Sequence, residues 1–111
     1  KLSIVPGLRL LEEDPAITAN YAYFPVLIER DFWCERDELY ERLKRSAVFA
    51  RRYFYPLITT FPMYRGFPSA ASSNLPVATR KADQILCLPL YPELSMVDQD
   101  RVIAALKGNE K

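Results

Sequence analysis

The sequence predicts a small α+β domain in which helices cover one face of a short, mainly antiparallel sheet. A chain of 111 residues is long enough for one buried core but for few elements. Apolar runs of strand length alternate with amphipathic helical stretches in the order β, β, α, β, loop, α, β, α. Few strands combined with helices of this length are typical of an α+β sandwich.

The first quarter of the chain predicts two strands. A Pro-Gly turn at residues 6–7 precedes a short strand over residues 8–11. Residues 21–28, within NYAYFPVLIE, are apolar on both alternating faces and rich in aromatic and β-branched side chains, which predicts a buried strand. Pro25 cannot donate to a ladder, so it indicates a bulge or an edge position there.

A helix and a third strand follow. CERDELYERLKRS, residues 34–46, carries Leu39, Tyr40 and Leu43 at helical spacing. Its acidic side chains come early and its basic ones late, which suits the helix dipole. After a break, the short aromatic run at residues 48–53 predicts a strand.

The segment from residue 56 to residue 75 predicts a long loop. It has little periodicity and contains prolines and a run of small residues. Long ordered loops are often functional. A helix should begin at Leu75 or Pro76, with Asn74 as its cap, and run to about Gln84.

The last quarter predicts a strand and a helix. ILCLPL, residues 85–90, forms the strand. Ser95 followed by Asp98 resembles a capping box. The helix after it carries an apolar stripe and ends at Gly108.

Composition narrows the class of protein. Fifteen basic and fourteen acidic side chains leave a net charge of +1, so the composition shows no excess of positive charge of the kind that binds polyanions. No apolar run approaches the about twenty residues of a membrane span. Cys34 and Cys87 match no metal or redox spacing, so we expect reduced, cytosolic thiols. Because the chain starts at Lys1 without a signal pattern, we expect an excised piece of a longer protein.

The chain lacks a catalytic set of its own. It has no histidine, no glycine-rich phosphate loop and no clustered metal carboxylates. A Schiff-base lysine would need burial or a cationic neighbour. The lysines instead fall on predicted helix surfaces or at the termini: Lys1, Lys44, Lys81, Lys107 and Lys111. Taken alone, this chain should have no catalytic residue, no metal site and no activity.

The sequence VFARRYFYPLI suggests a binding surface. Several basic residues lie close together before and within it: Arg42, Lys44, Arg45, Arg51 and Arg52. Such a patch suits a phosphate or diphosphate, although a solvated helix face is the simpler interpretation of the first three. In a strand, Arg51 and Arg52 would point to opposite faces, so at most one enters a given pocket. Tyr53, Phe54 and Tyr55 are either core or a binding lip, which Tyr64 and Arg65 of the loop could join.

Six segments, in this order and spacing, resemble the C-terminal domain of the DegT/DnrJ/EryC1/StrS aminotransferases. The resemblance runs from about residue 7 to residue 108, with LPLYPEL and ARRYFYP as its most specific parts. The segments are NYAYFPVLIE, RDELYERLKR, FARRYFYPL, PMYRG, LPVATRKADQILCLPLYPEL and DRVIAALKG.

The resemblance implies that residues 1–111 are the small C-terminal domain of a fold-type I, pyridoxal-phosphate-dependent enzyme. Such enzymes move an amino group from glutamate onto a nucleotide-linked keto sugar, and the RRYFYP form is similar to those acting on thymidine-diphosphate keto-deoxysugars. The resemblance also implies a homodimer, with the reactive lysine and most cofactor contacts in a large N-terminal domain. Arg52, Tyr53, Phe54 and Tyr55 would then face the nucleotide sugar.

Three alternatives stay open. A dehydratase branch of the same family replaces the lysine with histidine. A free-standing module could stack its rings on nucleic acid, although a net charge of +1 argues against it. The aromatic residues could also only fill the core of a structural domain that dimerises.

Overall fold

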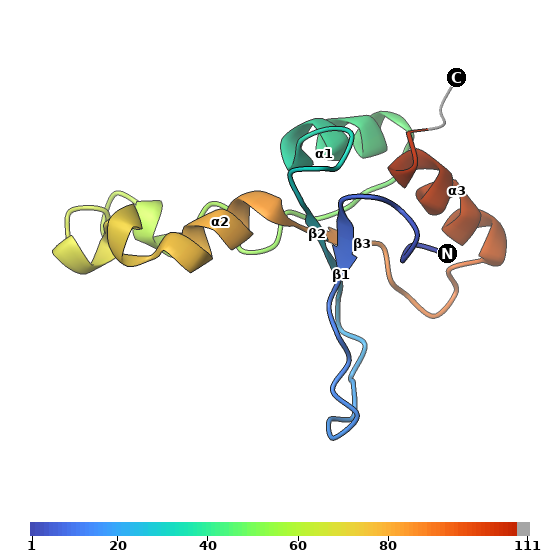
Figure 1. Ribbon diagram of the computed structural model, residues 1–111, viewed down its shortest axis with the longest axis horizontal. Coiled ribbons are helices and arrows are strands. Elements are labelled where there is room, and N and C mark those ends of the chain that lie inside the picture. The colour runs from blue at the N-terminus through green and yellow to red at the C-terminus, as the bar shows by residue number, and fades with distance from the viewer. Residues whose placement is uncertain (109–111) are drawn as a thin grey trace.

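The computed structural model describes residues 1–108 and confirms the α+β class. Three strands form one antiparallel sheet in the order β1-β2-β3. Helices α1 and α3 pack against each other beside the sheet, whereas α2 projects away from it (Figure 1). In chain order the elements are β1 (Leu8–Leu10), β2 (Phe24–Ile28), α1 (Arg36–Arg45), α2 (Pro76–Gln84), β3 (Ile85–Leu88) and α3 (Met96–Leu106).

The core lies between the sheet and the pair α1 and α3. Alternate residues of β2 and β3 face these helices, as period-2 strands require. Five side chains are fully buried there: Val26, Leu39, Leu43, Leu86 and Leu106. Burial of a leucine or valine stabilises the fold by roughly 1.5–3 kcal/mol per side chain. The helical spacing of Leu39 and Leu43 therefore predicted the buried face of α1 correctly.

Pro25 lies in the central strand, and its pairing with β3 is regular, so the bulge or edge position predicted for it is wrong. Its partner Cys87 exchanges both backbone hydrogen bonds with Arg51, on the outer side of β3. The Pro25–Cys87 pair is therefore a non-hydrogen-bonded pair, and the backbone of Pro25 points toward β1. The ladder between β1 and β2 ends at the pair of Leu10 and Val26, so Pro25 has no partner on β1. The missing N–H of proline thus removes no ladder hydrogen bond.

The strand predicted at residues 48–53 is wrong in extent. Val48 and Ala50 are buried and Phe49 is exposed, so the expected alternation is present. Only Arg51 pairs with the sheet, through one isolated bridge to Cys87. Ala47 and Phe54 both have positive φ angles, 58° and 44°, and these turns prevent a longer ladder.

The other predicted boundaries are nearly correct. The strand predicted over residues 21–28 begins at Phe24, because Tyr21 has a φ of 53° that no strand accommodates. The strand predicted over residues 85–90 ends at Leu88, before Pro89. Helix α1 is shorter than the predicted residues 34–46, and β1 ends one residue before the predicted residue 11.

The ends of the helices test the predicted caps. Ser95 accepts a hydrogen bond from the backbone N–H of Asp98 at 3.1 Å, so Ser95 is confirmed as the N-cap. The Asp98 carboxylate accepts from the Ser95 hydroxyl at 2.7 Å, whereas in a complete capping box it would accept from the Ser95 backbone N–H. Gly108 has the left-handed φ of 69° typical of a residue after a helix. The predicted cap at Asn74 is wrong, because its side chain donates to the carbonyl of Pro68 and α2 starts after Leu75 without a side-chain cap.

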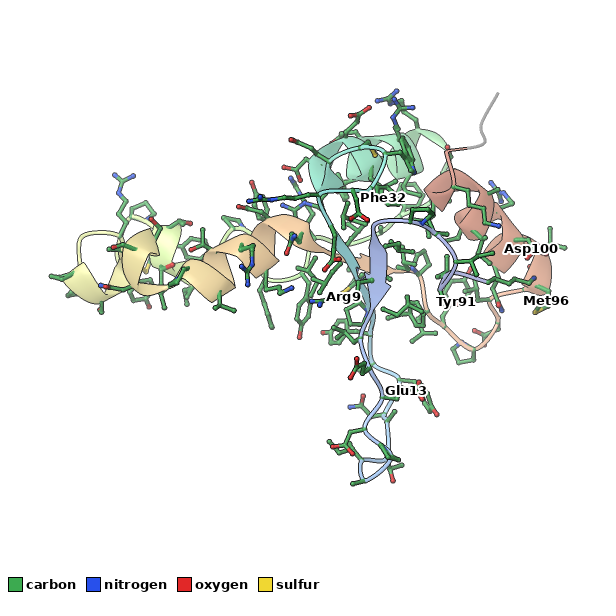
Figure 2. All side chains as sticks on the ribbon, in the orientation of Figure 1. Arg9, Glu13, Phe32, Tyr91, Met96 and Asp100 are labelled. Carbon is green, nitrogen blue, oxygen red and sulfur yellow. The ribbon has the colours of Figure 1, made fainter. Side chains whose placement is uncertain are left out.

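Two segments project from the body of the domain (Figure 1). The hairpin arm, residues 11–23, joins β1 to β2 and carries Glu13 near its middle (Figure 2). The α2 arm, residues 57–84, contains the predicted loop as three short 3₁₀ turns followed by α2. Because of these arms the radius of gyration is 15.7 Å, against about 13 Å for a compact chain of similar length.

Both arms expose large apolar side chains. The hairpin arm exposes Leu11, Ile17, Tyr21 and Tyr23, and the α2 arm exposes Ile58, Met63, Phe67 and Val77. Contiguous exposed apolar surface marks sites of interaction. No helix in residues 1–108 combines the length and apolar character needed to cross a bilayer.

Candidate functional site

The predicted binding residues lie on the segment that follows the bridge at Arg51. Two backbone hydrogen bonds to Cys87, of 2.9 and 2.8 Å, fix the start of this segment on the sheet. The positive φ of Phe54 then turns the chain, and the Tyr55–Pro56 peptide bond is cis. The turn distributes the predicted side chains over two separate groups.

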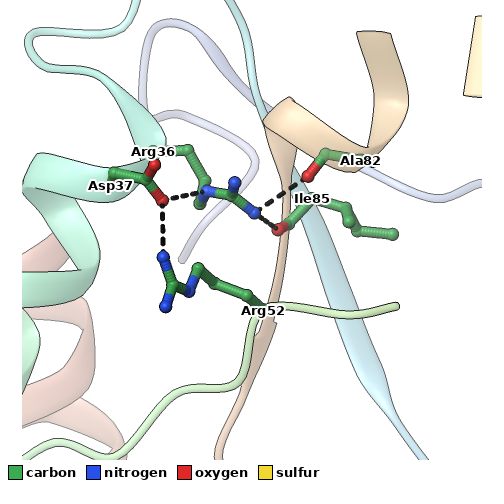
Figure 3. Close-up of polar contacts among 5 residues, drawn as sticks. All are labelled: Arg36, Asp37, Arg52, Ala82 and Ile85. Carbon is green, nitrogen blue, oxygen red and sulfur yellow. Dashed lines mark hydrogen bonds and ion pairs between the residues drawn. The ribbon is translucent and has the colours of Figure 1, made fainter. Parts of the chain in front are cut away.

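The first group surrounds Arg36, a buried guanidinium that joins three elements (Figure 3). Arg36 begins α1 and is only 4% exposed. Its Nη1 donates to the carbonyl oxygens of Ala82 at 2.9 Å and Ile85 at 3.1 Å. These carbonyls belong to the end of α2 and the start of β3, so Arg36 fastens α1 to the junction between them.

Arg36 and Arg52 share one carboxylate. Asp37 Oδ1 lies 2.7 Å from Arg36 Nε and 3.4 Å from Arg52 Nη1 (Figure 3). The shorter contact is an ion pair without hydrogen-bond alignment. Both guanidinium groups also lie over the ring of Tyr55, with their carbons 4.5 and 4.7 Å from its centre. Arg52 lies 4.7 Å from the ring of Tyr40 as well. Arg52 is therefore stacked and paired within its own domain.

The second group is a set of aromatic rings on the opposite side of this turn. Tyr53 packs against Tyr23 of the hairpin arm, with ring centres 5.1 Å apart. It also contacts Phe54, at 4.1 Å. Phe54 is 74% exposed, so it does not belong to the core. Of the four predicted residues, Arg52 and Tyr55 thus meet α1, whereas Tyr53 and Phe54 form a ring surface with Tyr23.

Sequence reasoning missed Arg36, Asp37, Tyr40 and Tyr23 as members of these groups. One signal pointed to Arg36. A cation at the first position of a helix opposes the helix dipole, so some other contact has to compensate for it. The buried carbonyls of Ala82 and Ile85 provide that contact.

A groove opens on the side of Arg51 and has a volume of about 380 Å³. Its wall is formed by residues 22–23, 47–49, 51, 87–91 and 94 and by the first turns of α3. Arg51 and Arg101 supply its cations, and Asp98 supplies a carboxylate 3.3 Å from Arg101. Tyr23, Phe49 and Tyr91 line it with rings; Tyr91 lies on the connection from β3 to α3 (Figure 2).

The remaining candidates carry little chemistry. Burial raises the pKa of the Cys34 thiol to about 11, with Glu38 adding to the rise and Arg42 opposing it. Burial also raises the pKa of Cys87, against the lowering effect of Arg51. Both cysteines are free. Within residues 1–108 no group of three or more potential metal ligands occurs.

The loop residues and the helix-face cations do not join either group. Tyr64 and Arg65 lie exposed on the α2 arm. Arg42 pairs with Glu38 across one turn of α1 at 2.7 Å, and Lys44 and Arg45 are exposed on that helix. These three basic residues therefore form the solvated helix face that the sequence left as one alternative.

The fold, a short antiparallel sheet with two packed helices, is shared by solved structures of aminotransferases. Residues 1–107 match the DegT/DnrJ/EryC1/StrS aminotransferase family, and the chain belongs to this family. The resemblance noted from the sequence is thereby confirmed.

Two relatives carry specific names. The chain is 47% identical over 90 residues to a dTDP-4-amino-4,6-dideoxy-D-glucose transaminase of Escherichia coli, covering 81% of this chain and 24% of the relative. It is 35% identical over 107 residues to a Shigella dysenteriae transaminase of the same name, covering 96% of this chain and 29% of that one. The chain therefore spans about a quarter of the length of these relatives.

Solved structures support the same fold. The aminotransferase TlmJ of Streptoalloteichus hindustanus superposes with a TM-score of 0.78 at 31% identity, over 96% of this chain and 27% of TlmJ. A DegT/DnrJ/EryC1/StrS aminotransferase of Brucella abortus gives 0.72 at 23% identity, over 93% of this chain and 26% of that structure.

Proposed function

We propose that residues 1–111 are the single C-terminal domain of a pyridoxal-phosphate-dependent transaminase. The full-length protein moves an amino group from glutamate onto a nucleotide-linked keto-deoxysugar, with thymidine diphosphate as the carrier. The main support is the 47% identity to a relative named as a dTDP-4-amino-4,6-dideoxy-D-glucose transaminase. Family membership over residues 1–107 agrees with it.

The described residues do not fit a site for pyridoxal phosphate. A Schiff-base lysine needs burial or a cationic neighbour that lowers its pKa. Lys1, Lys44 and Lys107 are exposed, and Lys81 is half-buried on α2. Lys111 lies outside the described residues. The proposal therefore places the reactive lysine and the cofactor contacts in a large N-terminal domain and assigns no catalytic residue to this chain.

This chain contributes substrate contacts through Arg52, Tyr53, Phe54 and Tyr55. The ring surface of Tyr53 and Phe54 offers apolar area for a base or a deoxysugar, and the tyrosine hydroxyl offers a hydrogen bond. Arg52 and Tyr55 are held by α1 through Asp37 and Tyr40. Residues that bind a substrate act best when their own packing holds them in place.

The full-length protein is proposed to be a cytoplasmic homodimer. The exposed apolar residues of the hairpin arm and the α2 arm support an additional packing surface, because a compact monomer would not leave both arms bare. Light scattering of the full-length protein tests this point, and a monomer at micromolar concentration would contradict it.

The test of the function uses the full-length protein loaded with pyridoxal phosphate. Glutamate and dTDP-4-keto-6-deoxyglucose are supplied, and the nucleotide product is identified by mass spectrometry. An aminated sugar nucleotide is the expected product. A deoxygenated sugar would identify the dehydratase branch instead, and the absence of visible cofactor absorbance would refute both reactions.

A variant pair tests the ring surface. Tyr53→Ala should raise the KM for the nucleotide sugar roughly tenfold, since loss of a stacked ring costs about 1–3 kcal/mol. Tyr53→Phe, the matched control, keeps the ring and removes only the hydroxyl. Thermal melts show whether both variants fold. An unchanged KM in folded Tyr53→Ala would remove Tyr53 from the pocket.

A further inference from the structure

We infer that the groove beside Arg51 binds the diphosphate of the substrate, and that Arg51 rather than Arg52 is the cation that meets it. This inference rests on the proposed function and names the part of the substrate that enters a particular groove. The two arginines are neighbours in the sequence, but their surroundings differ in a way that decides between them.

Arg52 is already engaged. It pairs with Asp37 at 3.4 Å and stacks on the rings of Tyr40 and Tyr55. Asp37 already offsets the charge of Arg52 and occupies its Nη1, so Arg52 has less charge and fewer donors to offer an anion. Within residues 1–108, the guanidinium of Arg51 has neither a hydrogen bond nor an ion pair. Arg51 therefore has its full donor capacity for a ligand.

The backbone position of Arg51 is fixed by the sheet. Both of its backbone polar groups are bonded to Cys87, on an edge of the sheet. An arginine on a rigid element loses less conformational freedom on binding than one on a mobile loop. Arg101 lines the same groove from α3, where Asp98 holds its guanidinium at 3.3 Å.

Charge and shape favour an organic diphosphate as the occupant. Arg51 and Arg101 line the groove together with one carboxylate, that of Asp98, so its lining has an excess of positive charge. Guanidinium groups bind phosphate oxygens in a bidentate manner. The volume of about 380 Å³ is within the range of small-ligand pockets. Tyr23, Phe49 and Tyr91 would contact the nucleoside or the sugar at either end.

A protein segment with only apolar side chains would fit the groove poorly. A protein segment without an acidic group would bury Arg51 without a partner, and an unpaired buried charge is strongly unfavourable. A diphosphate supplies the missing charge and also leaves Phe49, which is 71% exposed, available for stacking.

The experiment measures binding of inorganic pyrophosphate and of thymidine diphosphate to the full-length, cofactor-loaded protein by calorimetry. Arg51→Gln should weaken both ligands at least tenfold, Arg51→Lys less, and Arg52→Gln less than Arg51→Gln. Lys44→Gln, on the exposed face of α1, is the control for loss of one charge. If Arg51→Gln does not fold by circular dichroism, the comparison uses Arg51→Lys.

Transamination by the wild type is measured separately. If Arg51→Gln binds pyrophosphate more weakly but the wild type shows no transamination, the anion site is supported and the proposed function is refuted. Wild-type transamination with equal diphosphate affinity in Arg51→Gln, or a larger loss in Arg52→Gln, would overturn the inference and leave the function intact. Loss of pyridoxal phosphate loading with unchanged diphosphate affinity would assign Arg51 to the cofactor and also overturn it.

Discussion

Replacement of Arg36 by methionine should destabilise this domain more than any other single removal of charge on α1. Methionine retains much of the side-chain volume but has no donor for the carbonyls of Ala82 and Ile85. A buried acceptor left without its donor costs about 1–3 kcal/mol, and the partly buried Ile85 carbonyl falls at the low end. Loss of the guanidinium over Tyr55 adds about 0.5–1 kcal/mol.

The contact with Asp37 adds little, because that carboxylate is more than half exposed. The expected loss is therefore about 3 kcal/mol in the free energy of unfolding. With a urea m-value of about 2 kcal/mol/M, the midpoint should fall by about 1.5 M.

Urea unfolding of the 111-residue chain measures this change. Trp33 is the only tryptophan in the chain, and its indole N–H donates to the carbonyl of Leu106 at 2.8 Å, so its fluorescence reports on the contact between the segment before α1 and the end of α3. Arg45→Met is the matched control, since Arg45 is exposed at the other end of α1 and should change stability by less than about 0.5 kcal/mol. Equal midpoints for the two variants would refute the reasoning that the buried carbonyls depend on Arg36.

Three further predictions concern single residues. Ser95→Ala should lower the free energy of unfolding by about 1 kcal/mol through loss of the cap on α3, as measured by urea unfolding, and no change would mean that solvent replaces the cap. Gly7→Ala should lower the free energy of unfolding by more than about 1 kcal/mol, because Gly7 has a φ of 71° and an added Cβ would lie 2.1 Å from the backbone nitrogen of Phe32. A variant as stable as the wild type in urea unfolding would contradict this close approach. Cys34 should resist iodoacetamide at pH 8, because its pKa of about 11 keeps it protonated. Rapid labelling of the folded chain at pH 8 would contradict the raised pKa. The raised pKa of Cys34 also contributes to the stability of the fold below pH 9.0, the pKa in the unfolded chain, and this contribution should be lost as the pH rises from 9.0 to about 11.

The resemblance and the local signals predicted more of the fold than of the site. Helix α2 was placed at its observed bounds, and the N-cap of α3 was found from Ser95 and Asp98. The segment at residues 48–53 was misassigned because its alternation is that of a strand, whereas its neighbours Ala47 and Phe54 turn the chain. Positive φ angles at alanine and phenylalanine leave no signature in the sequence.

The sequence by itself determined the α+β class, the buried face of α1 and the family to which the chain belongs. These features depend on residue type and short spacing, which act locally along the chain. Only the tertiary structure decided that Arg52 stacks against α1 while Arg51 faces an open groove, and that Arg36 is buried. These outcomes depend on contacts between segments far apart in the sequence, such as Arg36 with Ala82 and Arg51 with Cys87, and spacing along one segment carries no information about them.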